Sequence, residues 1–253
     1  KKERAKDELP QSAGGRTIMT TEPKFIPNEA VEISLANNLK FKTRLVDCVG
    51  YLVDNAIGYL EDDMPRMVKT PWSEEEIPFE KAAEIGTKKV IEEHSTIGIL
   101  VTTDGSVTGI PREDYIKPEE RVVAELKSLN KPFVILLNST DPNSDYTKEL
   151  SKTLAEKYDT TVIPINCEYL DINDINNIFS KILYEFPADQ IRIKFPRWVD
   201  GLDFSHPLKA ELFKEIKEAF ENVNVLKDIS SCTSKISSTE IISNTVITDI
   251  QLG

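Results

Sequence analysis

Apolar residues in the middle of the chain form short continuous runs, as strands buried on both faces of a parallel sheet require. These runs are 96–103 (TIGILVTT), 132–138 (PFVILLN) and 160–166 (TTVIPIN). Helices are predicted between and after them, at 118–130, 144–158 and 171–184. This alternation predicts βαβ units and therefore a parallel sheet covered by helices. Pro164 lies inside the third run, which predicts that this strand is at an edge of the sheet.

The start of the chain shows a different pattern. Residues 1–28 are polar and interrupted by proline and glycine, so we expect no regular element there. Apolar residues then alternate with polar ones at 30–35 and at 40–47. Period two is typical of half-buried strands, and Asn37-Asn38 between the two segments favours a hairpin turn. We therefore expect one antiparallel pair of strands before the parallel sheet.

The remaining stretches give weaker patterns. Residues 51–79 carry no clear period and are expected to be irregular, whereas 79–94 are predicted to form a helix. After Pro187 an amphipathic helix is predicted at 208–220, and the Ser/Thr/Ile-rich segment 229–252 has strand-like propensity. We place a domain boundary after this proline.

Size and charge limit what the protein can be. The chain has 253 residues, 40% hydrophobic and 29% charged, which is a globular composition. Residues 1–187 are interpreted as one α/β domain, and 188–253 as a linker, a helix and the beginning of a second domain. The net charge of −12, with no long basic run, argues against a nucleic-acid partner. A local basic pocket for a single nucleotide is still compatible with this charge.

Cysteine usage and hydropathy indicate a cytosolic protein. Cys48, Cys167 and Cys232 match no zinc-binding spacing, and an odd number of cysteines fits a reducing compartment. No apolar run approaches the length of a membrane span, and the polar start resembles no signal peptide. A chain that opens inside a charged run, without methionine, is expected to be a portion of something longer.

An Asp-x-x-Gly motif, Asp47 to Gly50, follows the second predicted strand. In P-loop triphosphatases an aspartate in this place holds Mg²⁺, usually through water, and the glycine lets the backbone approach the γ-phosphate. The alternative is that Asp47 simply ends a strand at a turn. The motif is short and occurs by chance in many proteins, so it needs support from its surroundings.

Thr20 and Thr21 lie in the polar loop before the antiparallel strands. Ras-like triphosphatases place a threonine in this loop, where its hydroxyl binds Mg²⁺ and senses the γ-phosphate. Thr20 and Thr21 are therefore candidate sensors, with Thr21 and Asp47 as candidate metal ligands. The alternative is an ordinary Ser/Thr turn made rigid by Pro23.

Asn138 and Asp141 follow the PFVILLN run, where guanine-binding proteins carry Asn-Lys-x-Asp. Ser139 replaces the lysine, so the aliphatic stem that would cover the base is lost, guanine selectivity is in doubt and adenine becomes plausible. Asn166 follows the next strand and is a further candidate contact to the base. The alternative is a strand-to-helix turn with ordinary capping residues.

The order of these elements predicts a Ras-like P-loop triphosphatase fold: a mostly parallel sheet with one antiparallel hairpin strand and helices on both faces. Ligands of such sheets bind at the carboxyl ends of strands, where Asp47 and Asn138 fall. The phosphate-loop pattern G-x-x-x-x-G-K-[ST] is absent from the sequence. We expect the first strand and this loop to precede Lys1, and the chain alone to be inactive.

Longer stretches carry a more specific resemblance. They are 7–31 (DELPQSAGGRTIMTTEPKFIPNEAV), 44–51 (RLVDCVGY), 65–72 (PRMVKTPW), 78–105 (PFEKAAEIGTKKVIEEHSTIGILVTTDG) and 183–187 (LYEFP). With these stretches the chain resembles the stage IV sporulation protein A family, the coat-morphogenesis ATPases of spore-forming bacteria. The similarity covers residues 1–200 well and fades toward Gly253.

The resemblance implies an ATPase region, related to Ras-like GTPases but using ATP and Mg²⁺, followed by a middle and a C-terminal domain. It assigns the Mg²⁺ aspartate to Asp47 and the sensor threonines to Thr20 and Thr21. It implies that ATP hydrolysis drives self-assembly into the basement layer of the spore coat, in the mother-cell cytoplasm at the forespore outer membrane. The implied partners are further copies of the protein, a small membrane-anchoring peptide and spore coat proteins.

Two other functions are compatible with the sequence. A non-enzymatic scaffold would need no phosphate loop and would still offer assembly surfaces. A regulatory GTPase is suggested by Asn138 and Asp141.

Overall fold

The computed structural model describes residues 24–34, 40–48, 50–56, 59–61, 64–70, 73–237 and 241–248. The chain divides into two compact units, residues 1–178 and 179–253. Each unit is described by itself below.

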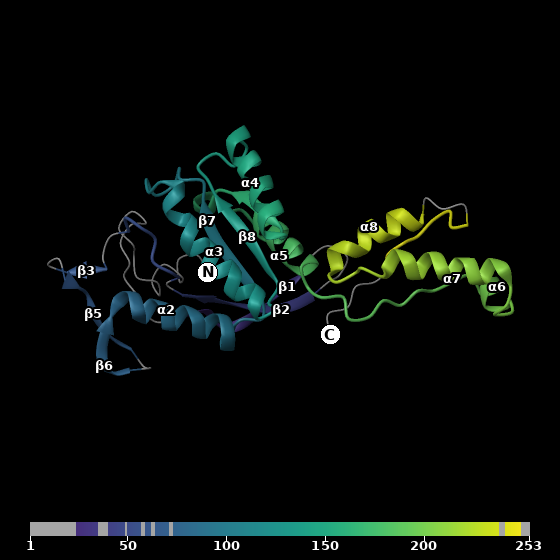
Figure 1. The fold of residues 1–253 in the computed structure, drawn as a ribbon, viewed down its shortest axis with the longest axis horizontal. Helices are drawn as coiled ribbons and strands as arrows, with labels where there is room; N and C mark the ends of the chain where they lie inside the picture. Colours follow the sequence, from purple (N-terminus) through teal and green to yellow (C-terminus); the bar gives the residue numbers. More distant parts are fainter. Residues whose placement is uncertain are drawn as a thin grey trace. The chain divides into compact units, whose positions relative to one another are not determined.

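The first unit is built on a three-stranded parallel sheet (Figure 1). Its strands are β7 (Gly98–Thr103), β8 (Phe133–Asn138) and β9 (Val162–Ile165). They pair in the order β7-β8-β9, so the predicted parallel sheet is confirmed. Pro164 lies in β9, at an edge of this sheet as predicted, where the missing N–H of proline costs no ladder bond on the open side.

Both faces of the sheet are covered, which is why β8 has a continuous apolar sequence. Ile135 and Leu137 point to one face and Val134 and Leu136 to the other, and all four are buried. The first face packs against apolar side chains from the helices that precede and follow β8. Helices lie on both sides of the sheet (Figure 1).

Helix α3 (Arg112–Ser128) connects β7 to β8, and α4 (Asp145–Tyr158) connects β8 to β9. After β9 come the short 3₁₀ turn η3 (Cys167–Tyr169) and α5 (Ile172–Tyr184). The sequence placed the start of α3 at Pro118, which is wrong, because the helix begins six residues earlier. Arg112 is anchored by a buried ion pair with Glu119 about two turns later, and this contact outweighs the backbone bond that Pro118 cannot make.

Strands β1 (Lys24–Ser34) and β2 (Lys40–Asp47) form the predicted antiparallel pair, in a sheet of their own. We expected Pro27 to prevent regular structure, but β1 runs through it. The pairing register shifts between Ile26 and Val31, and this irregularity accommodates the proline, which cannot donate to a ladder. The predicted turn at Asn37-Asn38 lies outside the described residues.

The segment after β2 is more regular than expected. Two antiparallel pairs of short strands occur there: β3 (Leu60–Glu61) with β4 (Met64–Pro65), and β5 (Met67–Thr70) with β6 (Ser73–Pro78). The apolar partners are few, mainly Val68 opposite Ile77, so no period is visible in the sequence. The predicted helix follows as α2 (Phe79–Lys89) and ends in a π-helical turn, η2 (Val90–His94).

The two edges of the parallel sheet differ. Strand β9 carries Pro164 at its edge, whereas β7 pairs with β8 alone among the described strands. The side chain of Val101, in the middle of β7, is 56% exposed. The β7 side of the sheet therefore presents apolar surface to solvent in the part of the chain that the structure describes.

The second unit is helical, with α6 (Arg197–Asp200), α7 (Pro207–Phe220) and α8 (Leu226–Ile236). The strand-like reading of 229–252 is wrong over α8. Cys232 and Ile236 are spaced for one helical face and are buried, while hydroxyls such as Ser234 Oγ donate back to a carbonyl of the same helix. None of the described helices is long and apolar enough to cross a membrane.

Candidate functional site

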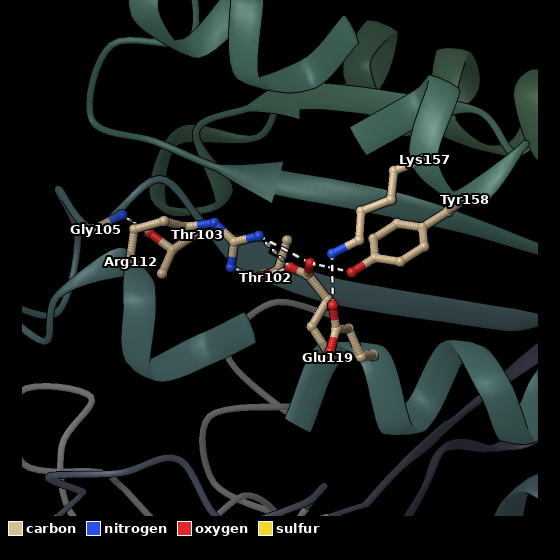
Figure 2. A network of polar contacts seen from close by, with 8 residues as sticks. Thr102, Thr103, Gly105, Arg112, Glu119, Lys157 and Tyr158 are labelled. Atoms are coloured by element: carbon tan, nitrogen blue, oxygen red, sulfur yellow. Dashed lines mark hydrogen bonds and ion pairs between the residues drawn. The ribbon is translucent and has the colours of Figure 1, made fainter. Parts of the chain in front are cut away.

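Strand β7 ends in two buried threonines that point to opposite faces of the sheet (Figure 2). Thr103 Oγ1 accepts a hydrogen bond from the Gly105 backbone N–H at 3.1 Å, which closes a tight turn after the strand. Gly105 has a φ of +93°, and a Cβ there would lie 3.2 Å from the backbone nitrogen of Arg112. The turn therefore requires glycine.

Asp104 connects this turn to helix α4. One carboxylate oxygen accepts from the Ser106 backbone N–H (2.9 Å) and hydroxyl (2.6 Å), and the other accepts from the Thr147 hydroxyl (2.8 Å). Partial burial of the carboxyl favours its neutral form, but hydrogen bonds from Ser106, Ser139 and Thr147 outweigh this and lower the pKa of Asp104. Asp104 is therefore an ionised brace between β7 and α4 at neutral pH.

The carboxyl ends of β8 and β9 are joined through two asparagines. Asn138 Oδ1 accepts from the Cys167 backbone N–H at 3.0 Å, and Asn166 Nδ2 donates to the Thr140 carbonyl at 3.4 Å. Asn166 Oδ1 also accepts from Glu168 N–H at 3.0 Å, which caps η3. The structure thus brings the candidate residues Asn138 and Asn166 together, each holding the neighbouring loop.

Ser139, at the position where guanine-binding proteins carry lysine, points inward. Its side chain is buried (1% exposed), and its oxygen accepts from the Asp141 backbone N–H at 3.0 Å and lies 3.3 Å from Thr147 Oγ1. In this orientation the Ser139 side chain holds the loop from inside, and no side chain at this position covers the outer surface of the loop. The loss of a covering side chain, which the sequence suggested, agrees with this geometry.

Asp141 remains exposed at the edge of the same loop. Its Oδ1 accepts from the Asn143 backbone N–H at 3.2 Å, in the turn that leads to α4. The helix itself is capped by Ser144, whose Oγ accepts from Thr147 N–H at 3.2 Å. Asp141 therefore takes part in the turn, as the alternative reading proposed, and still presents a carboxylate to solvent.

The other candidate group lies at the end of β2. Asp47 is the last residue of that strand, opposite Lys24 of β1, and its side chain is exposed. Gly50 has a φ of +80°, a conformation that glycine adopts readily. This group belongs to a different sheet from Asn138, Asp141 and Asn166. Thr20 and Thr21 lie outside the described residues.

A buried charged cluster that the sequence did not reveal lies below the end of β7 (Figure 2). The Glu119 carboxylate, 2% exposed, lies 2.8 Å from the Arg112 guanidinium and accepts from Thr102 Oγ1 at 2.7 Å. The Tyr158 hydroxyl of α4 also donates to it, at 2.8 Å. Burial and the Glu119 contact raise the pKa of Tyr158 to about 12, so the phenol stays a donor. Glu119 therefore joins β7, α3 and α4.

The arrangement offers hydrogen-bonding groups and exposed carboxylates at the carboxyl ends of strands, where ligands of α/β sheets bind. No group of three or more His, Cys, Asp or Glu with metal-binding geometry occurs among the described residues. A surface groove lies elsewhere, between η2 and the last turns of α3, and is lined by Lys88, Ile91, Glu92, Glu125, Ser128 and Leu129. This groove has none of the candidate residues in its lining.

Comparisons with family models and with curated proteins point to the same family. A family model described as the ATPase domain of stage IV sporulation protein A matches residues 1–187, and one described as its middle domain matches residues 188–253. The chain is 47% identical over 253 residues to stage IV sporulation protein A of Clostridioides difficile (strain 630). It is 46% identical over 252 residues to that of Bacillus anthracis and 45% identical over 250 residues to that of Bacillus subtilis (strain 168).

These alignments cover 99–100% of this chain and 51–52% of each relative. The chain therefore spans about half the length of the curated relatives it matches. No solved structure matches it.

Proposed function

Because the chain belongs to the stage IV sporulation protein A family, we propose that the protein containing it hydrolyses ATP and uses hydrolysis to assemble with copies of itself into the basement layer of the spore coat. The observation that carries this proposal is the match of residues 1–187 to the family's ATPase domain. Asp47 and Asn138 each end a strand, β2 and β8, and follow one another along the chain in the order that a Ras-like P-loop domain would have.

The chemistry of the Asp47–Gly50 turn fits a magnesium nucleotide. Asp47 presents an exposed carboxylate at a strand end, and oxygen ligands of this kind suit Mg²⁺. Asp47 would hold Mg²⁺ through water together with Thr20 or Thr21 and a phosphate-loop hydroxyl, and bound Mg²⁺ would supply charge neutralisation for the phosphates. The proposed reaction is in-line attack of water on the γ-phosphate of ATP.

The base would lie over the loops that follow β8 and β9. Asn138 and Asn166 hold these loops, and Asp141 offers an exposed carboxylate at their edge. The inward orientation of Ser139 leaves the loop without a lysine stem for guanine, which supports ATP as the substrate. If the protein instead prefers GTP in a nucleotide competition assay, the substrate assignment is wrong.

Asp47→Ala in the full-length protein tests the enzymatic proposal. We expect ATP turnover to fall at least about 100-fold, because the residue would hold the metal that neutralises the phosphates. Asp54→Ala removes an exposed aspartate seven residues along the chain and should leave turnover within about twofold. Unchanged ATP turnover in Asp47→Ala would show that this residue does not hold the metal.

A non-enzymatic scaffold is the second candidate, since a protein that only offers assembly surfaces would need no bound nucleotide. Calorimetric titration of the 253-residue chain with ATP and Mg²⁺ tests this candidate, because tight binding of the nucleotide would contradict a non-enzymatic scaffold.

We also propose that the protein acts in the mother-cell cytoplasm at the forespore surface, held there by a small membrane-anchoring peptide and bound by coat proteins. Sedimentation of the full-length protein with ATP and with a non-hydrolysable analogue tests assembly. Equal sedimentation under both conditions would separate assembly from hydrolysis.

A further inference from the structure

The residue that follows the Asp47–Gly50 turn is fixed to a distant helix. Tyr51 is buried, 9% exposed, directly after Gly50. Its hydroxyl donates to the carboxylate of Glu125 on α3, which lies 74 residues away in the sequence. A buried phenol that reaches this far fixes the backbone on its own side of the turn.

Arg121 completes the Tyr51 contact. Its guanidinium lies 3.9 Å from the centre of the Tyr51 ring, and its Nε is 3.5 Å from the Glu125 carboxylate. The same guanidinium pairs with Glu84 of α2. Tyr51 is therefore bound to α3 and, through Arg121, to α2. Burial, followed by the Glu125 contact, raises the pKa of the phenol, so it remains a neutral donor at physiological pH.

We propose that Tyr51 is a positioning residue for the Asp47–Gly50 turn, and this inference rests on the proposed hydrolysis of ATP at that turn. Gly50, at φ +80°, is conformationally permissive, so its own backbone does not select one geometry. The Tyr51–Glu125 contact supplies the missing restraint one residue later. The Tyr51 hydroxyl is committed to Glu125, so it does not itself orient the attacking water.

The arrangement separates a positioning role from a purely structural one. Phenylalanine at position 51 keeps the buried ring and the Arg121 stacking and removes the hydroxyl that reaches Glu125. If the Tyr51–Glu125 hydrogen bond served stability alone, this change would lower stability and leave the chemical step unchanged. If the hydroxyl holds the turn, turnover falls while nucleotide affinity is retained, because small displacements of a reacting group affect the transition state most.

The experiment uses the full-length protein with Tyr51→Phe, Glu125→Met, which has no oxygen to accept from the phenol, and both together, and Tyr184→Phe as a control at an exposed tyrosine. We expect each single variant to lower kcat about tenfold, with KM for ATP within about twofold of wild type. The double variant should be no slower than the singles, because both remove the same contact. The control should match wild type, and kcat of each variant is compared after correction for its folded fraction, taken from melting curves.

If the wild-type protein hydrolyses ATP and Tyr51→Phe has the same kcat, the positioning role is overturned and the proposed hydrolysis stands. A multiplicative loss in the double variant also overturns it, because the two residues would then act separately. A lower kcat that is fully accounted for by a smaller folded fraction assigns Tyr51 to structure alone. If wild-type protein shows no ATP turnover, the proposed hydrolysis fails and the positioning role fails with it.

Discussion

The carboxyl end of the parallel sheet and the Asp47–Gly50 turn carry the two groups of candidate residues, and they are held in different ways. At the sheet, Asp104 and Asn138 bond to neighbouring loops and α4, above the buried Glu119 cluster. At the turn, the described restraint comes from Tyr51 and a partly exposed Arg121. The first group should therefore carry more of the folding stability, and the second should move at lower energetic cost.

Glu119→Ala should have the largest effect, because it leaves Arg112 charged and buried without its partner. Loss of one member of a buried pair costs about 3–5 kcal/mol of unfolding free energy. Denaturant titration measures this cost. Glu120→Ala is the matched control, since its bond to Lys157 is half exposed and should contribute about 0.5 kcal/mol. Equal costs for the two variants would show that the buried cluster does not support the sheet.

Ser139→Lys should destabilise the protein by about 1–3 kcal/mol, because the buried site has no room for a longer side chain. The loop would have to open before the ammonium reached solvent. We expect no gain in GTP affinity, which isothermal titration of the full-length variant would measure. A stable variant with a clear GTP preference would show that the loop is more adaptable than its hydrogen bonds indicate.

Arg121→Met should cost less, about 1 kcal/mol, because the guanidinium is 47% exposed and its ion pairs are screened by solvent. The apolar methionine stem keeps part of the packing on Tyr51. Denaturant titration beside Lys214→Met, an exposed cation of α7, gives the comparison. If Arg121→Met lowered the unfolding free energy more than Ser139→Lys, the Asp47–Gly50 turn rather than the sheet would be the more firmly held group.

Acid sensitivity of Asp104 should be the smallest effect. Its folded pKa is lowered, so its carboxylate stabilises the fold above the unfolded value of about 3.9, and this contribution is lost as pH falls through the folded pKa. Below about pH 4, the unfolding free energy of Asp104→Asn should therefore fall less steeply than that of wild type. Asp200→Asn, at an exposed aspartate, controls for net charge. Parallel curves would contradict the brace role of Asp104.

The sequence predicted the parallel sheet well because each strand contains a short continuous apolar run, most clearly β8, whose side chains are buried on both faces. Pro164 even indicated the correct edge. The sequence-based prediction failed where tertiary contacts decide the bounds or the type of an element. The start of α3 depends on the Arg112–Glu119 pair, and α8 was misread because its serines and threonines resemble strand residues until their bonds to helix carbonyls are seen.

The candidate site was predictable in part. Asn138 and Asn166 were identified from their positions after apolar strands, and the structure joins their loops. The buried Glu119 and the Tyr51 contact carried no recognisable signal, because neither pairing of distant residues leaves a local motif. The assignments of Thr20, Thr21 and Asp47 to the metal stay predictions.

The two edges of the parallel sheet have a practical consequence for handling the 253-residue chain. Pro164 protects the β9 edge from pairing with another molecule. In the described part of the chain β7 pairs on one side only, and its apolar residue Val101 is exposed. Such an edge can recruit a strand from a neighbouring molecule, and this recruitment leads to aggregation. A lysine in place of Val101 would act as a gatekeeper and should raise the concentration at which the chain stays in solution.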